Sequence, residues 1–98
     1  MSESNQTLSA QVLIVDDEVG HADVMAEALQ RLGHVCTIVN DLPAAKDELQ
    51  HGTFDVVVTD LVMDDEEDGL RVLEIAGQTQ PNAETIMVTA HGDVPTAK

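Results

Sequence analysis

Short apolar runs alternate along this chain with longer stretches in which apolar residues recur every three or four positions. The short runs predict buried parallel strands, because they are rich in Val and Ile and are bounded by polar residues. They lie at residues 12–16, 35–39, 54–59 and 85–88. The longer stretches predict helices at residues 19–32, 42–51 and 70–76, with another beginning at residue 93. This alternation predicts an α/β domain with helices on both faces of a parallel sheet.

Capping residues support the predicted helix boundaries. Gly33 is a natural terminator of the first helix. Asp41 is placed to cap the second helix, and Pro43 falls in its first turn, where a missing N–H costs little. The apolar positions of the first helix are Val24, Met25, Ala28, Leu29 and Leu32. Those available to the buried side of the third helix are Leu70, Val72, Leu73 and Ala76.

The chain is strongly acidic, with nineteen Asp and Glu against four Lys and Arg and a formal net charge of −15. This balance argues against direct binding to nucleic acid or to an anionic membrane. No apolar stretch approaches the roughly 20 residues of a membrane span, and the polar start lacks the layout of a signal peptide. We therefore expect a cytoplasmic protein, with residues 1–10 as a disordered leader and residues 11–98 as one domain.

Three carboxylates follow two of the predicted strands. Asp16 and Asp17 close the first strand, and Asp60 closes the third. Ligands of open α/β sheets bind beyond the carboxyl ends of the strands, so neighbouring strands would bring these side chains into one pocket. Such a cluster is costly unless a cation lies in it, and oxygen ligands favour a hard ion such as Mg²⁺. The sequence therefore predicts metal-assisted phosphoryl chemistry.

Four stretches, at residues 12–18, 55–63, 68–70 and 88–90, occur in an order and at a spacing that cover nearly the whole chain. Together they resemble the receiver domain of two-component response regulators. Residues 59–63 and 89–92 are most similar to the nitrogen-regulation subfamily of transcriptional activators. The resemblance implies a flavodoxin-like, doubly wound parallel sheet and a role in phosphorelay signal transduction rather than in enzymatic turnover.

The resemblance also implies roles for individual residues. Asp60 would be the phosphoacceptor, a carboxylate nucleophile that receives a phosphoryl group from a sensor histidine kinase. Asp17 would bind Mg²⁺ directly, Asp16 would help through water, and the backbone carbonyl of Val62 would complete the protein ligands. Thr89 would be the switch hydroxyl that turns toward the new phosphoryl group.

Two features depart from the family pattern. The loop after Asp60 carries Asp64 where the family usually has Pro, and Gly69 lies one residue late. The sequence also lacks the fifth strand, with its Lys, and the fifth helix. We therefore expect a C-terminally truncated receiver fold, with the output domain, of a transcriptional type, outside this chain.

Two alternatives remain open from the sequence alone. Truncation would expose the edge at residues 85–88, which favours self-association and an interaction-only module without efficient phosphorylation. A phosphohydrolase of the haloacid dehalogenase type would use Asp16 as its nucleophile and Glu18 as its acid/base group, but it would leave Asp60 unexplained.

Overall fold

The computed structural model of the protein describes residues 9–60 and 68–88, which form a four-stranded sheet and three helices. In chain order the elements are β1 (Gln11–Val15), α2 (Val19–Arg31), β2 (Val35–Val39), α3 (Leu42–His51), β3 (Val56–Asp60), α4 (Asp68–Thr79) and β4 (Glu84–Val88). Each overlaps a segment expected from the sequence, so the predicted alternation is confirmed. The helix expected from residue 93 lies outside the described residues.

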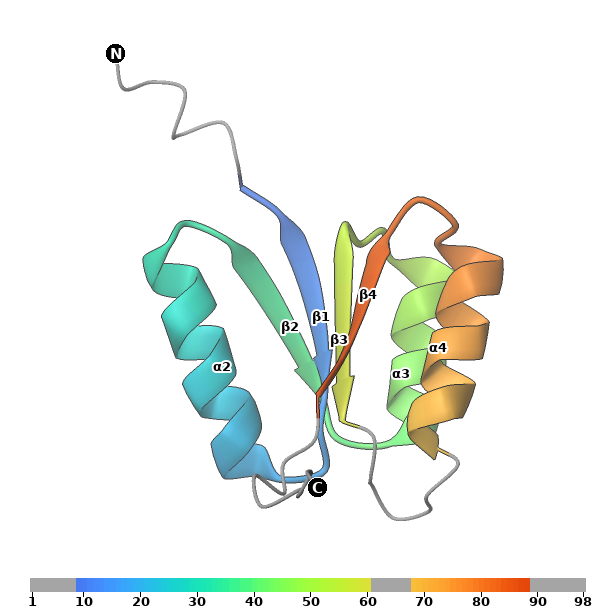
Figure 1. Ribbon diagram of the computed structural model, residues 1–98, viewed down its shortest axis with the longest axis horizontal. Coiled ribbons are helices and arrows are strands. Elements are labelled where there is room, and N and C mark those ends of the chain that lie inside the picture. Colours follow the sequence, from blue (N-terminus) through green and yellow to red (C-terminus); the bar gives the residue numbers. More distant parts are fainter. Residues whose placement is uncertain (1–8, 61–67, 89–98) are drawn as a thin grey trace, which may run out of the picture.

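All strand pairs are parallel, and the order across the sheet is β2-β1-β3-β4 (Figure 1). Helix α2 covers one face, and α3 and α4 cover the other. Residues 12–15 of β1 are buried on both faces. Leu13 and Val15 belong to the core beneath α3 and α4, whereas Val12 and Ile14 belong to the core beneath α2. The doubly wound α/β sheet predicted from the sequence is confirmed.

The connections between the strands reverse direction at the centre of the sheet. The chain leaves β1 through α2 and adds β2 on one side, then crosses back through α3 and adds β3 on the other side of β1. The helices that follow β1 and β3, α2 and α4, therefore lie on opposite faces of the sheet. A reversal of this kind opens the crevice in which open α/β sheets bind their ligands.

Only part of the apolar set named for the first helix faces the sheet, since Met25 and Leu29 pack against the core beneath α2 whereas Val24 and Leu32 do not. Ala22 and Ala26 are buried. Val24 and Leu32, which share the helical period, are 67% and 73% exposed. The small alanines allow a close approach to β2, where the thiol of Cys36 lies 3.9 Å from the carbonyl oxygen of Ala26.

The start of α3 is as predicted, and the bounds of α4 are not. The side chain of Asp41 accepts a hydrogen bond from the backbone N–H of Ala44 at 2.8 Å, and Pro43 lies in the first turn.

Helix α4 begins two residues earlier and ends three residues later than expected. Gly69 is consequently part of the helix and buried, and Leu70, expected to be buried, is 55% exposed.

Two residues that we assigned to a disordered leader contact the domain. The hydroxyl of Ser9 donates a hydrogen bond to the carbonyl of Gly33 at 2.8 Å. The backbone N–H of Ala10 donates to Nδ1 of His34 at 3.0 Å. These contacts contradict the expected disorder of Ser9 and Ala10, whereas the rest of the expected leader lies outside the described residues.

Strand β4 ends the strand order, and no other described strand lies along its outer edge. Glu84, Thr85 and Ile86 on this strand are exposed. Association of two copies along the edge stays a prediction.

Of the three helices described, none has the length and apolar character needed to cross a membrane.

Candidate functional site

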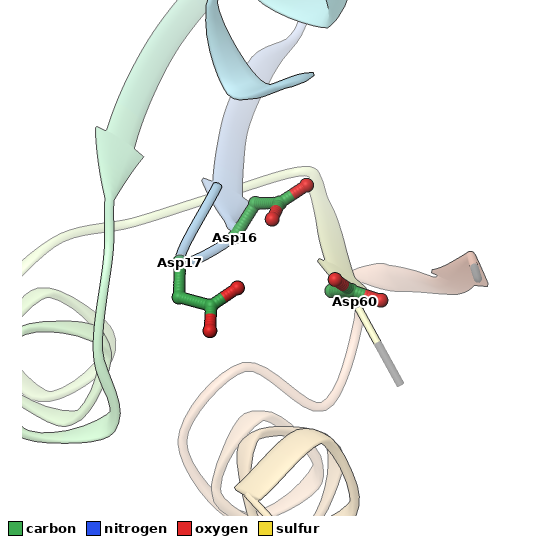
Figure 2. A group of neighbouring side chains, drawn as sticks. All are labelled: Asp16, Asp17 and Asp60. Atoms are coloured by element: carbon green, nitrogen blue, oxygen red, sulfur yellow. The ribbon is translucent and has the colours of Figure 1, made fainter. Parts of the chain in front are cut away.

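Three carboxylates meet at the carboxyl ends of β1 and β3, as Figure 2 shows. The strand register places Val15 beside Thr59, so the next residues along the two strands, Asp16 and Asp60, are neighbours. Asp17 follows and completes the group. One carboxylate oxygen of each residue lies within 4.8 Å of those of the other two. The convergence that the sequence predicted is therefore confirmed for Asp16, Asp17 and Asp60.

Asp16 is held by its backbone and by its side chain. Its N–H continues the ladder toward β2 by donating to the carbonyl of Val39 at 3.1 Å. Its own carbonyl accepts a hydrogen bond from Nδ2 of Asn40 at 2.8 Å. Its Oδ1 accepts from the backbone N–H of Glu18 at 2.9 Å, and its Oδ2 lies 3.9 Å from Nδ1 of His21 on α2.

The surroundings of Asp16 raise the pKa of its carboxyl above the ordinary value of 3.8. Burial is the main cause, because it disfavours the charged form. The hydrogen bond from Glu18 opposes this shift, and the nearby carboxylate of Asp60 adds to it. His21 and Asp17 contribute smaller effects, the first lowering and the second raising the pKa. The site therefore resists holding all of its negative charge without a counter-ion.

The donor set fits a hard divalent cation. All three residues of the cluster offer carboxylate oxygens, the ligands preferred by Mg²⁺ and Ca²⁺. Asp16 and Asp60 are buried, whereas Asp17 is exposed, so the cluster opens toward solvent on one side. This suits Mg²⁺, which usually keeps several of its waters.

The backbone at Asp60 is supported from within the strand. Thr59 is fully buried, and its hydroxyl donates to the carbonyl of Asp60 at 3.2 Å. Two other residues that we assigned to the site, Val62 and Thr89, lie outside the described residues. Their roles as a carbonyl ligand and as a switch stay predictions.

Two neighbours of the site were not assigned from the sequence. Asn40 directly follows β2, so the rule that pointed to Asp16 and Asp60, a polar residue after a strand, would also have found it. His21 lies near the start of α2. It is half exposed, yet it faces the buried Asp16, a contact that depends on the angle at which α2 crosses the sheet.

Residues 12–98 match the response regulator receiver domain family. This chain belongs to that family. Receiver domains are non-enzymatic signalling modules, so the phosphohydrolase alternative, with Asp16 as the nucleophile, is not supported.

The curated relatives of this receiver domain include several transcriptional regulators. It is 28% identical over 86 residues to the transcriptional regulatory protein ZraR of Klebsiella oxytoca, covering 88% of this chain and 19% of ZraR. It is 29% identical over 89 residues to the DNA-binding transcriptional regulator NtrC of Azospirillum brasilense, covering 91% of this chain and 18% of NtrC. For GlrR of Escherichia coli the identity is 31%, covering 90% of this chain and 20% of GlrR. The receiver domain thus spans about a fifth of these relatives.

Solved structures of response regulators share the fold. The beryllofluoride-activated NtrC receiver domain is 31% identical, with a TM-score of 0.70 over 90% of this chain and 70% of that one. The response regulator TrrA of Thermotoga maritima, in complex with Mg²⁺ and beryllofluoride, is 26% identical, with a TM-score of 0.73 over 86% and 76% of the two chains. TrrA in complex with the histidine kinase ThkA gives 26% identity and a TM-score of 0.73 over 88% and 73%.

Proposed function

We propose that this receiver domain accepts a phosphoryl group on Asp60 from the phosphohistidine of a sensor histidine kinase. An oxygen of the Asp60 carboxylate attacks phosphorus, the bond from phosphorus to the histidine nitrogen breaks, and its electron pair returns to the imidazole. The acyl phosphate would then regulate a transcriptional output domain outside this chain.

The observation that carries the proposal is the placement of Asp60. It ends a central strand, is 2% exposed, and lies beside two further carboxylates at the point where the strand order reverses. A carboxylate fixed on a strand is a better oriented nucleophile than one on a mobile loop. The neighbouring carboxylates supply ligands for a cation next to the attacking oxygen.

Mg²⁺ would be held by Asp17 directly, by Asp60, by Asp16 through water and by the carbonyl of Val62. When bound, it would neutralise negative charge on the phosphoryl group. The hydroxyl of Thr89 would turn toward the phosphorylated Asp60 and transmit its state. TrrA, solved with Mg²⁺ and beryllofluoride, supports the metal, and the complex of TrrA with ThkA supports the class of partner.

Phosphorylation tests the nucleophile. Treatment with acetyl phosphate and Mg²⁺ should add the mass of one phosphoryl group to the intact chain, and Asp60→Asn should prevent the addition. Asp23→Asn is the matched control, since Asp23 is exposed on α2. An adduct that survives Asp60→Asn would place the nucleophile elsewhere. A wild-type chain that gains no phosphoryl group would favour the interaction-only module.

Metal titration tests the ligands separately. Asp17→Asn should weaken Mg²⁺ binding by roughly tenfold or more, because affinity follows the charge of the ligand set. Asp23→Asn should leave it nearly unchanged. Calorimetry or metal-dependent amide shifts would measure both. Equal losses in the two variants would indicate diffuse attraction to an acidic surface instead of a defined site.

A further inference from the structure

Asn40 joins the end of β2 to the loop that carries the acidic cluster. Its side-chain Nδ2 donates a 2.8 Å hydrogen bond to the carbonyl of Asp16, 24 residues away in the sequence. The last registered pair of β1 and β2 is Val15 with Val39, and the N–H of Asp16 donates to the carbonyl of Val39. The bond from Asn40 therefore extends the ladder by one side-chain link after the strands have ended.

This link acts on the peptide group that leads into Asp17. The carbonyl of Asp16 and the N–H of Asp17 belong to the same planar unit. Fixing the direction of that carbonyl therefore restricts the direction in which Asp17 leaves the strand. Because Oδ1 of Asp16 is already bonded to the N–H of Glu18, residues 16–18 are held at two points.

Repulsion between the carboxylates of the cluster is the force that this restraint opposes. Three carboxylates with oxygens within 4.8 Å of one another tend to separate when no cation is bound. Asp17 is the exposed member and follows the strand, so its position depends on the backbone that leads into it. A donor on the carbonyl before it opposes that separation and keeps the ligand set arranged for a cation.

We propose that Asn40 is a positioning residue for the cation site, holding Asp17 in place through the Asp16 carbonyl without contacting the ion. The proposal rests on the proposed function, in which Mg²⁺ binds the carboxylates. Outer partners that orient metal ligands typically change affinity by about 10–100-fold when they are lost. A simple turn residue would affect stability and leave the affinity unchanged.

The test compares Mg²⁺ affinity with thermal stability in wild type, Asn40→Ala, Asn40→Gln and Asn82→Ala. Asn82 is the matched control, because it is an exposed turn residue that precedes β4. Asn40→Ala should weaken Mg²⁺ binding by roughly tenfold. The melting temperature of the metal-free protein should change little. It should also shift the Asp17 amide resonance before metal is added. Asn40→Gln should recover part of the affinity, since its amide still donates, and Asn82→Ala should match wild type.

The outcomes separate this inference from the function on which it rests. Wild type that binds no Mg²⁺ would overturn the proposed metal site, and the role of Asn40 with it. Wild type that binds Mg²⁺ together with an Asn40→Ala variant of equal affinity would overturn the role of Asn40 alone. A loss of affinity that Asn82→Ala reproduces would also overturn it, because the effect would then be general.

Discussion

The sheet has a carboxyl edge, where its strands end, and an amino edge, where they begin. Both edges carry polar side chains, but these side chains act in opposite ways. At the carboxyl edge, where β1 and β3 end, Asp16, Asp17 and Asp60 bring like charges together. At the amino edge, where the same strands begin, polar side chains bond to backbone groups of opposite polarity. Oδ2 of Asp55, for example, accepts from the backbone N–H of Gln11 at 2.8 Å. The amino edge therefore stabilises the fold, whereas the carboxyl edge gathers like charges at some cost in stability.

Gln80 is the strongest example at the amino edge. Its Oε1 accepts a hydrogen bond from the N–H of Phe54 at 3.0 Å. Its Nε2 donates to the carbonyls of Leu49 at 2.9 Å and of Gly52 at 2.8 Å. One side chain thus connects the residue after α4 to the end of α3 and to the segment entering β3.

The largest predicted effect on stability is that of Gln80→Leu. It would leave one N–H and two carbonyls without their partner in a partly buried place, which should lower the free energy of unfolding by about 2–4 kcal/mol. Gln78→Leu, on the exposed surface of α4, is the control. Urea denaturation would measure both variants. Similar losses in the two would mean that the amino edge does not depend on Gln80.

The affinity of folded Gln80→Leu for Mg²⁺ should equal that of wild type, because its bonds lie at the other edge from the carboxylates. A change in affinity that persists after correction for unfolded protein would show that the two edges are coupled. The contrast between the edges would then not hold.

The contrast also explains what the sequence could predict. The strands and the carboxylate cluster depend on local patterns, namely apolar runs and the residues that directly follow them. The bonds of Gln80 and the contact between Ala10 and His34 depend on which segments meet in space. No local pattern marks a glutamine after a helix as a link between three segments.

Helix α2 shows the same limit within one element. Apolar residues occur on several sides of it, so spacing alone allowed more than one buried face. The face in contact with the sheet carries Ala22 and Ala26, because close packing on a sheet favours small side chains. The larger Val24 points elsewhere and is 67% exposed.

A second prediction tests how closely the amino edge is packed. A Cβ added at Gly52 would lie 3.0 Å from the carbonyl oxygen of Glu48 and 3.0 Å from the ring of Phe54. Gly52→Ala should therefore destabilise the protein by about 1–2 kcal/mol. Gly77→Ala makes the same change inside α4, where nothing lies within 4 Å, and should stabilise it by about 0.5–1 kcal/mol. Thermal unfolding would compare them, and changes of the same sign would contradict this packing.

The last prediction tests the carboxyl edge, where the expected change is smaller and of opposite sign. Asp16→Asn should stabilise the metal-free protein at neutral pH by about 1 kcal/mol, a common gain when a functional site is relieved of strain. The amide removes a buried charge beside Asp60 and keeps an acceptor for the N–H of Glu18. Asp55→Asn, the same change at the amino edge, should give no gain, because it weakens a charge-assisted bond to Gln11.

The pH dependence follows from the raised pKa of Asp16. Because the carboxyl binds a proton more tightly in the folded protein, its contribution to stability is complete below its ordinary pKa of 3.8 and is lost as the pH rises through the raised value. The advantage of Asp16→Asn should therefore be absent at low pH and grow as the pH rises through that interval. Saturating Mg²⁺ should reduce the stability advantage of Asp16→Asn at neutral pH, because a bound ligand stabilises the folded protein and wild type has the complete set of carboxylates. Chemical denaturation across this pH range, with and without Mg²⁺, would measure the difference in the free energy of unfolding between variant and wild type. If wild type is the more stable of the two in metal-free neutral buffer, the cluster is not a cation site under electrostatic strain.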